Sequence, residues 1–175
     1  MKMPVLLRKL HYWGSIVIAL PLAIMIGAGL MLMLKKDVEW IQPSSQKGIV
    51  TNVFPKASLT ELYASAKSVE QAGFTSWAEL NRVDFKPNKG IVKFVSKSNW
   101  EVQIDTQTSQ VLQVAKRRSD VIEAIHDGSF FADGVKLGVF LPAGIILFLL
   151  WLTGVYLLIT TEIAKAKRRR RNTIT

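Results

Sequence analysis

Two stretches without a formal charge, each 25 residues long, constrain this chain more than any other feature: they are residues 10–34 and 137–161. The hydrocarbon core of a bilayer is about 30 Å thick, and about 20 apolar helical residues cross it. Either stretch is therefore long enough to span a membrane. Because the polar segment 35–136 lies between them, the sequence predicts a membrane protein in which two transmembrane helices flank one small domain outside the bilayer.

The net charge of +10 lies mostly at the two ends of the chain. Segment 35–136 holds 14 Lys and Arg against 12 Asp and Glu, and contributes only +2. The tail 1–9 adds +3, and the tail 162–175, with six basic residues and one acidic residue, adds +5. Basic residues are enriched on the cytoplasmic side of transmembrane helices. We therefore expect both termini in the cytoplasm and the central domain on the opposite side of the membrane.

The basic tail also indicates which partners the chain binds. Basic residues beside a transmembrane helix attract anionic lipid headgroups by about 1 kcal/mol each. The run of four arginines at 168–171 has no interleaved aromatic residue, which is not typical of a surface that reads nucleic acid. We expect membrane lipids, and no nucleic acid, as partners.

Small residues recur at helical spacing near both apolar stretches. Ala19, Ala23 and Gly27 fall at positions i, i+4 and i+8, and Gly134 and Gly138 repeat this spacing before the second stretch. Small residues at such intervals let another helix approach closely inside a membrane. We predict that these five residues are helix-packing positions.

The central segment combines one helix with a set of short strands. Ser58 followed by Glu61 is the signature of a capping box, so a helix is expected to begin after Ser58, and Gly73 is typical of its end. From residue 81 onward, apolar and polar residues alternate in four short runs separated by turn-forming residues. The sequence therefore predicts an α+β domain with one helix packed on an antiparallel meander.

These signals divide the chain into seven segments. A second amphipathic run after Ser119 predicts a short helix at the membrane surface. The segments are an N-terminal cytoplasmic tail (1–9), a first transmembrane helix (10–34), a linker (35–57), the α+β domain (58–118), an interfacial helix with a connector (119–134), a second transmembrane helix (135–161) and a basic cytoplasmic tail (162–175).

Three short motifs occur in this order along the chain. The first, R-x-x-H-x-W, runs from Arg8 to Trp13 at the start of the first stretch. The second, V-x-I-D-x-x-T-S-x-V-L, runs from Val102 to Leu112 and contains Asp105 and Val111. The third is His126-Asp127-Gly128, followed by L-T-G-V-Y-L at 152–157. Together they resemble the PepSY-associated transmembrane family of bacterial inner-membrane proteins.

The resemblance implies a PepSY-like domain at 58–118, located in the periplasm, with Asp105 and Val111 in its terminal hairpin. Ser109 stands where this hairpin usually has glycine. Many members of the family have four transmembrane helices and two copies of the pattern, whereas this chain has two helices and one copy. It is therefore similar to half of such a protein, and we expect a homodimer or a membrane-protein partner.

Two functions follow from the resemblance. PepSY domains resemble the propeptide module of thermolysin-type proteases, which implies a role in peptidase inhibition or other protein binding. Four-span members include ferric-siderophore reductases, in which histidines of the matched motifs are associated with haem b. On that second implication, His11 and His126 are candidate haem ligands.

Geometry limits how these histidines can act. A haem held by two histidines needs both imidazoles at one iron. The first helix is about 35 Å long at 1.5 Å per residue, so one chain is not expected to bring both residues to the same iron. In a symmetric dimer each histidine meets its own copy, and a partner with its own histidines is the alternative. A simpler interpretation is that His11 is an interfacial polar residue and that the helix dipole stabilises His126.

A hydrolytic site is not expected in this chain. His126, Asp127 and Ser129 are too close in sequence to face one another as a catalytic triad. Two distant histidines do not form a zinc site, and the chain has no cysteine. Asp105 is interpreted as a turn former. The chain is not expected to be a complete enzyme by itself.

The favoured prediction is an accessory or haem b electron-transfer component, linked to iron or siderophore reduction. The alternative is a membrane-tethered periplasmic module that regulates a peptidase or senses the envelope without a cofactor.

Overall fold

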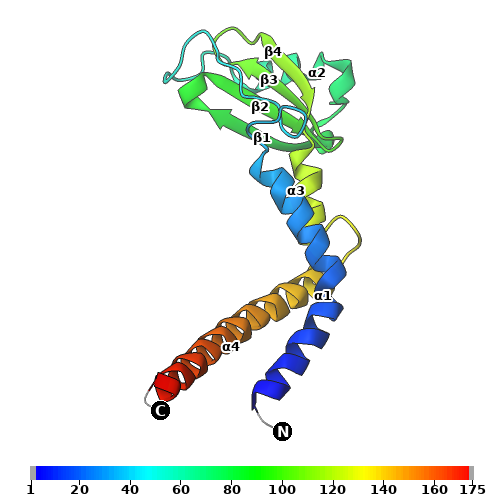
Figure 1. Ribbon diagram of the computed structural model, residues 1–175. Coiled ribbons are helices and arrows are strands. Elements are labelled where there is room, and N and C mark those ends of the chain that lie inside the picture. The colour runs from blue at the N-terminus through cyan, green and yellow to red at the C-terminus, as the bar shows by residue number, and fades with distance from the viewer. Residues whose placement is uncertain (1–2, 174–175) are drawn as a thin grey trace. The chain divides into compact units, whose positions relative to one another are not determined.

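The computed structural model describes residues 3–173, apart from the side chains of residues 3, 4, 168 and 171–173 (Figure 1). The chain forms two compact units. One unit comprises the chain up to Ala28 and from Ala124 onward, and we call it the helical unit. The other, Gly29–Glu123, contains the sheet, and we call it the sheet unit.

Two long apolar helices dominate the helical unit. Helix α1 spans Met3–Met33 and contains Pro21, and α4 spans Leu141–Thr173. A π-helical turn, η4 (Lys136–Phe140), leads directly into α4. Only 11% and 6% of the most apolar windows of the two helices are buried by protein. Their length and their bare apolar surface confirm the prediction of two membrane-spanning helices.

The sheet unit is a four-stranded antiparallel meander in the order β1-β2-β3-β4, with α2 (Leu59–Lys67) packed against it. This confirms the predicted α+β fold. The strands are β1 (Leu80–Lys86), β2 (Ile91–Ser96), β3 (Trp100–Asp105) and β4 (Val111–Lys116), and α3 (Ser119–Asp127) follows them.

The capping box positions α2 as the sequence predicts. The Ser58 hydroxyl accepts a hydrogen bond from the Glu61 amide at 3.3 Å, and the Glu61 carboxylate accepts one from the Ser58 amide at 2.7 Å. The Ser58 hydroxyl also donates to the Glu61 carboxylate at 2.8 Å, and the backbone and hydroxyl donors of Ser58 together lower the pKa of Glu61. After a short 3-10 turn the chain leaves the helix at Gly73, whose φ of +67° suits glycine.

One face of the sheet forms the apolar core with α2. Leu62, Tyr63 and Ala66 of the helix are buried against the central strands. On those strands Val92 pairs with Ile104 and Phe94 with Val102, so four apolar side chains lie on the face below α2. The alternating pattern in the sequence identifies this face because successive side chains of a strand point to opposite sides.

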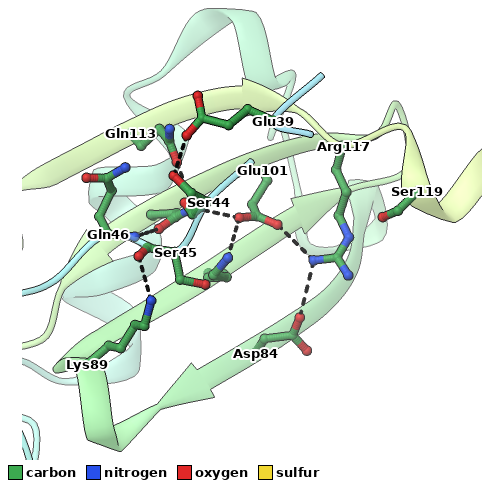
Figure 2. Close-up of polar contacts among 12 residues, drawn as sticks. Glu39, Ser44, Ser45, Gln46, Asp84, Lys89, Glu101, Gln113, Arg117 and Ser119 are labelled. Carbon is green, nitrogen blue, oxygen red and sulfur yellow. Dashed lines mark hydrogen bonds and ion pairs between the residues drawn. The ribbon is translucent and has the colours of Figure 1, made fainter. Parts of the chain in front are cut away.

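The opposite face of β2 and β3 is polar and is nevertheless buried. Residues 41–57, which we call the covering segment, lie over it (Figure 2). The Gln46 amide donates to Gln103 Oε1 at 2.8 Å, and Gln103 Nε2 donates to the Ser44 carbonyl at 2.8 Å. We expected residues 35–57 to be a linker, but the structure packs the covering segment against the sheet as part of the sheet unit. Its backbone groups find partners among buried polar side chains, as buried backbone requires.

Candidate functional site

His11 lies where α1 contacts α4 within the helical unit. Its Cε1 atom is 3.8 Å from the point where a Cβ atom on Gly154 would lie. One turn further, a Cβ on Gly14 would lie 3.2 Å from Leu150. Glycine at 154 therefore leaves room for the imidazole between the helices. His11 Nδ1 is buried and has no hydrogen-bond partner among the described residues, so none of these residues commits this ring nitrogen.

Two apolar cavities share His11 and Gly154 in their walls. The larger, about 800 Å³, is also lined by Arg8, Tyr12 and Leu158. The smaller, about 430 Å³, lies toward the middle of the helices and includes Ile18 and Trp151 in its lining. Both volumes fall in the range of roughly 300–1,000 Å³ that is usual for small-molecule sites. The mostly apolar walls and the cation of Arg8 are compatible with a large apolar ligand that carries acidic groups.

His126 is fixed in one orientation by a backbone contact. Its Nδ1 atom lies 2.8 Å from the carbonyl oxygen of Met25 on α1. Because a carbonyl can only accept a hydrogen bond, Nδ1 carries the proton and Nε2 retains its lone pair in the neutral ring. Metal-ligating histidines characteristically donate their other ring N–H to such a carbonyl. His126 also lines a third cavity of about 500 Å³, together with Phe140, Gly144 and Phe148.

Gly128, two residues after His126, allows the chain to pack against Phe140. Its φ is +83°, and a Cβ atom at this position would lie 2.5 Å from the Phe140 ring. Phe140 ends the π-helical turn and is buried. The two motif residues therefore have separate structural roles. His126 contacts α1, and Gly128 leaves space for the Phe140 ring, which lines the third cavity.

Asp127 holds the connection between α3 and α4 together. Its carboxylate accepts hydrogen bonds from Lys136 and from the amide and hydroxyl of Ser129. The Lys136 ammonium, followed by Ser129, lowers the pKa of Asp127 to about 2. Because the Ser129 hydroxyl donates to Asp127 rather than to His126, these residues form a turn and not a catalytic triad.

The two histidines lie at different depths along α1. His126 reaches Met25, which is about 21 Å from His11 along the helix at 1.5 Å per residue. We expected His126 near the far end of the first helix, and the structure instead brings it inside the span. The remaining separation is still too large for one chain to offer both imidazoles to one metal ion.

The predicted helix-packing positions make little contact within one chain. Ala19 lines the larger cavity beside His11, whereas Ala23 is exposed and a Cβ on Gly27 would meet nothing within 4 Å. Gly134 has a φ of +86° and precedes the π-helical turn that contains Gly138, so these two glycines do not form a stripe on a regular helix. Any packing role for these residues toward a second chain stays a prediction.

Asp105 forms the β3–β4 turn and also fixes the covering segment. Its carboxylate accepts hydrogen bonds from the amides of Gln107 at 2.7 Å, Thr108 at 2.9 Å and Ile49 at 2.6 Å. Burial alone raises the pKa of this carboxyl, but the three amides outweigh burial and lower it. Val111 begins β4 and pairs with Ile104 at a register shift. Both motif residues therefore have structural roles in the hairpin.

The comparison with family models covers nearly the entire chain. The model described as "PepSY-associated TM region" matches residues 8–174, which include both histidines. The chain belongs to this family. Searches of curated proteins and of solved structures found no match. The chain is thus a membrane protein with a PepSY domain. In this PepSY-associated TM protein, three residues of the sequence motifs lie at cavities or close contacts of the helical unit: His11, Gly128 and Gly154.

Proposed function

We propose that this PepSY-associated TM protein binds haem b through His11 and His126 and takes part in electron transfer across the bacterial inner membrane. The observation that supports this function most strongly is that each histidine lines an apolar cavity with one ring nitrogen uncommitted. A bound haem would supply one-electron iron chemistry, which protein side chains cannot provide.

His126 would serve as a ligand through Nε2. The Met25 carbonyl holds the Nδ1–H, fixes the tautomer and orients the ring, so no rearrangement of the imidazole is needed. Phe140 and Phe148 line the cavity at this level and would exclude water from the metal. An apolar wall of this kind favours retention of a macrocycle and tunes its potential.

His11 would serve as the second ligand at the other depth. Its unpartnered Nδ1 is costly to bury unless something satisfies it. Gly154 leaves space beside the ring, and Arg8 at the charged end of the cavity would neutralise an acidic substituent of the macrocycle. This polarity matches that of haem b, an apolar ring that carries carboxylates on one edge.

The cavity at His11 is open on the surface of the helix pair. Tyr12, Ile16 and Leu158 line it and are exposed in the single chain. A second chain could cover this side and add a second imidazole, which bis-histidine ligation requires. We therefore propose that haem lies between two chains, either two copies of this protein or one copy and a histidine-bearing membrane partner, and that the complex contributes to iron or siderophore reduction.

The visible spectrum of the full protein in detergent tests this function. Protein from haem-sufficient cells should show a Soret band and sharp reduced α and β bands, each weakened by about half in His11→Ala or His126→Ala and absent in the double variant. Lys97→Ala, at an exposed position of the sheet unit, is the control and should leave the bands intact. A colourless protein, or bands that survive both substitutions, would refute haem ligation.

An exposed apolar cluster favours a second function, protein binding by the PepSY domain. Phe54 at the end of the covering segment is 95% exposed, and Val53 and Phe85 beside it line a shallow cavity of about 330 Å³. Exposed aromatic residues of this kind often anchor protein partners. We propose a periplasmic peptidase as the partner. Photo-crosslinking from position 54 in intact cells should capture a defined envelope peptidase, and a cross-link pattern equal to that from exposed position 97 would argue against this function.

A further inference from the structure

A cavity in the sheet unit collects basic side chains. It measures about 470 Å³ and lies between the start of this unit, the covering segment and one end of β1 and β2. Figure 2 shows Lys89, Asp84 and Arg117, three of its lining residues, around the polar face of the sheet. Its walls contain one acidic residue, Asp84, against six basic residues: Lys35, Lys36, Lys86, Lys89, Lys93 and Arg117.

Two of the six positive charges are neutralised within the unit. Lys93 is buried and forms an ion pair with Glu101 at 2.7 Å. Arg117 forms ion pairs with Glu101 and with Asp120, both at 2.8 Å. Although burial lowers the pKa of Arg117, its hydrogen bonds to these two carboxylates outweigh burial and raise it. These pairs neutralise Lys93 and Arg117, and both carboxylate oxygens of Glu101 take part in them.

The other four charges have no counter-charge. The side chains of Lys35, Lys36 and Lys86 make no ion pair or hydrogen bond among the described residues. Lys89 donates to the Ser45 carbonyl at 2.8 Å, which is a neutral acceptor. Asp84 does not help them, because Arg82 holds its carboxylate at 3.2 Å. Four like charges around one cavity repel one another and produce a positive potential that attracts an anion.

A buried polar atom in the same wall also lacks a partner. Gln42 lines the cavity, and its Oε1 atom is buried without a hydrogen bond. An unsatisfied buried acceptor is destabilising unless water or a ligand donates to it. A protonated phosphate or a headgroup hydroxyl can supply that donor while the lysines contact the anionic oxygens.

We infer that this cavity binds a phosphate group, with Lys35, Lys36 and Lys86 as its counter-charges. Lysine ammonium groups bind phosphate as point charges and need no bidentate geometry. Lys35 directly follows Leu34, the last residue of the first apolar stretch, so its backbone is held close to the membrane surface. The phosphate can accordingly come from a lipid headgroup or from a soluble phosphate compound. This inference is independent of haem binding, because all of the residues lie in the sheet unit.

Binding to the full-length protein in neutral detergent tests the inference. Inorganic pyrophosphate at constant ionic strength probes a soluble source, and nanodiscs of phosphatidylglycerol compared with phosphatidylcholine probe a lipid source. The readouts are calorimetric affinity and the Tm of the protein. The test variant is K35Q/K36Q/K86Q, and the matched control is K56Q/K67Q/K97Q, which removes the same charge from exposed positions outside the cavity.

We expect one of the two probes to raise the Tm of the unaltered protein and of the control. The test variant should bind that probe at least about tenfold more weakly, since each basic residue near a membrane surface contributes about 1 kcal/mol. Stabilisation by pyrophosphate identifies a soluble ligand, and stabilisation only by phosphatidylglycerol discs identifies a lipid. Equal binding by the test and control variants, or no binding of either probe, overturns the inference.

A single substitution keeps the test valid if the triple variant misfolds. The side chain of Lys86 is exposed and makes no hydrogen bond or ion pair among the described residues. Lys86→Gln should weaken binding of the same probe about fivefold, whereas Lys97→Gln should not change it. Lys86 is on β1, away in sequence from the membrane-flanking lysines, so unspecific attraction of Lys35 and Lys36 to lipid does not explain such a loss. Equal affinity of Lys86→Gln and Lys97→Gln contradicts the proposed site.

Discussion

At the scale of single residues, buried polar side chains determine how the polar face of the sheet is covered. Asp105 combines a role that sequence motifs predict with one that they do not. Its position before a turn predicts the bonds to Gln107 and Thr108. The bond to Ile49 joins residues far apart in the sequence, and no local pattern indicates it.

Asp105→Asn should lower the free energy of unfolding of the sheet unit by about 3 kcal/mol, because an amide group cannot accept as many hydrogen bonds as a buried carboxylate. The loss should depend on pH. The folded pKa of Asp105 is lowered from its ordinary value of 3.8, so its stabilising effect is complete above about pH 4 and is lost as the pH falls through the folded pKa.

Urea unfolding of the full protein between pH 7 and pH 3 measures this effect. The difference between the unaltered protein and Asp105→Asn should shrink toward acid pH. Asp37→Asn, at an exposed position of the same unit, should show no comparable loss. A constant difference across this range would mean that Asp105 is not held as a carboxylate by its amide partners.

Ser109 replaces the glycine that is usual in the hairpin motif, and its backbone conformation is strained as a result. Its φ is +59°, in the left-handed region where a side chain is strained by roughly 1 kcal/mol or more. Ser109→Gly should therefore raise the free energy of unfolding by about 1 kcal/mol. Gln110→Gly, next to it at a position without positive φ, should lower it instead. Chemical unfolding of both variants checks the prediction, which fails if both change stability in the same direction.

At the scale of elements, the sequence predicts those parts of the fold that depend on local periodicity. The capping box of α2, the alternating strands and the two apolar helices all carry such a signal. The covering segment does not, because its bonds run from its backbone to side chains such as Gln103 on a distant strand. The same reason explains why the motifs identify His11 and His126 but not Met25, whose carbonyl contacts His126.

The connection between α3 and α4 offers a comparison of two glycines. Gly128 and Gly134 both have φ above +80°, but only Gly128 faces the Phe140 ring. Gly134→Ala should cost only backbone strain, about 1–2 kcal/mol, whereas Gly128→Ala adds a steric clash and should cost clearly more. Thermal unfolding in detergent measures the difference. Equal losses of Tm would show that Phe140 does not pack on Gly128.

At the scale of the whole molecule, the bare surfaces of α1 and α4 require an apolar environment. The absence of cysteine from the sequence makes the proposed orientation easy to test. Lys97→Cys places a thiol on the sheet unit, and Ala166→Cys places one on the basic tail, both at exposed positions. A membrane-impermeant maleimide should label Lys97→Cys in spheroplasts and label Ala166→Cys only after lysis. The reverse pattern would place the PepSY domain in the cytoplasm.

Electron transfer across the membrane would need metal sites at two depths. The two levels at which His11 and His126 lie along α1, about 21 Å apart, fit one haem at each level of a two-chain assembly. Neither proposed haem site would be complete without a second imidazole, so the proposal predicts that haem binding and association of chains occur together.

The haem content per chain, measured together with the mass of the detergent-solubilised complex, tests the central claim most directly. The account predicts on average one haem per chain in a two-chain homodimer, half of that in His11→Ala or in His126→Ala, and none in the double variant. If the partner is a different protein that carries histidines, each copy of this chain should still contribute a ligand to two haem sites. His11→Ala should then remove one of these sites, and His126→Ala should remove the other. Protein from haem-sufficient cells that contains no haem, or haem content that the double substitution leaves unchanged, would contradict the account.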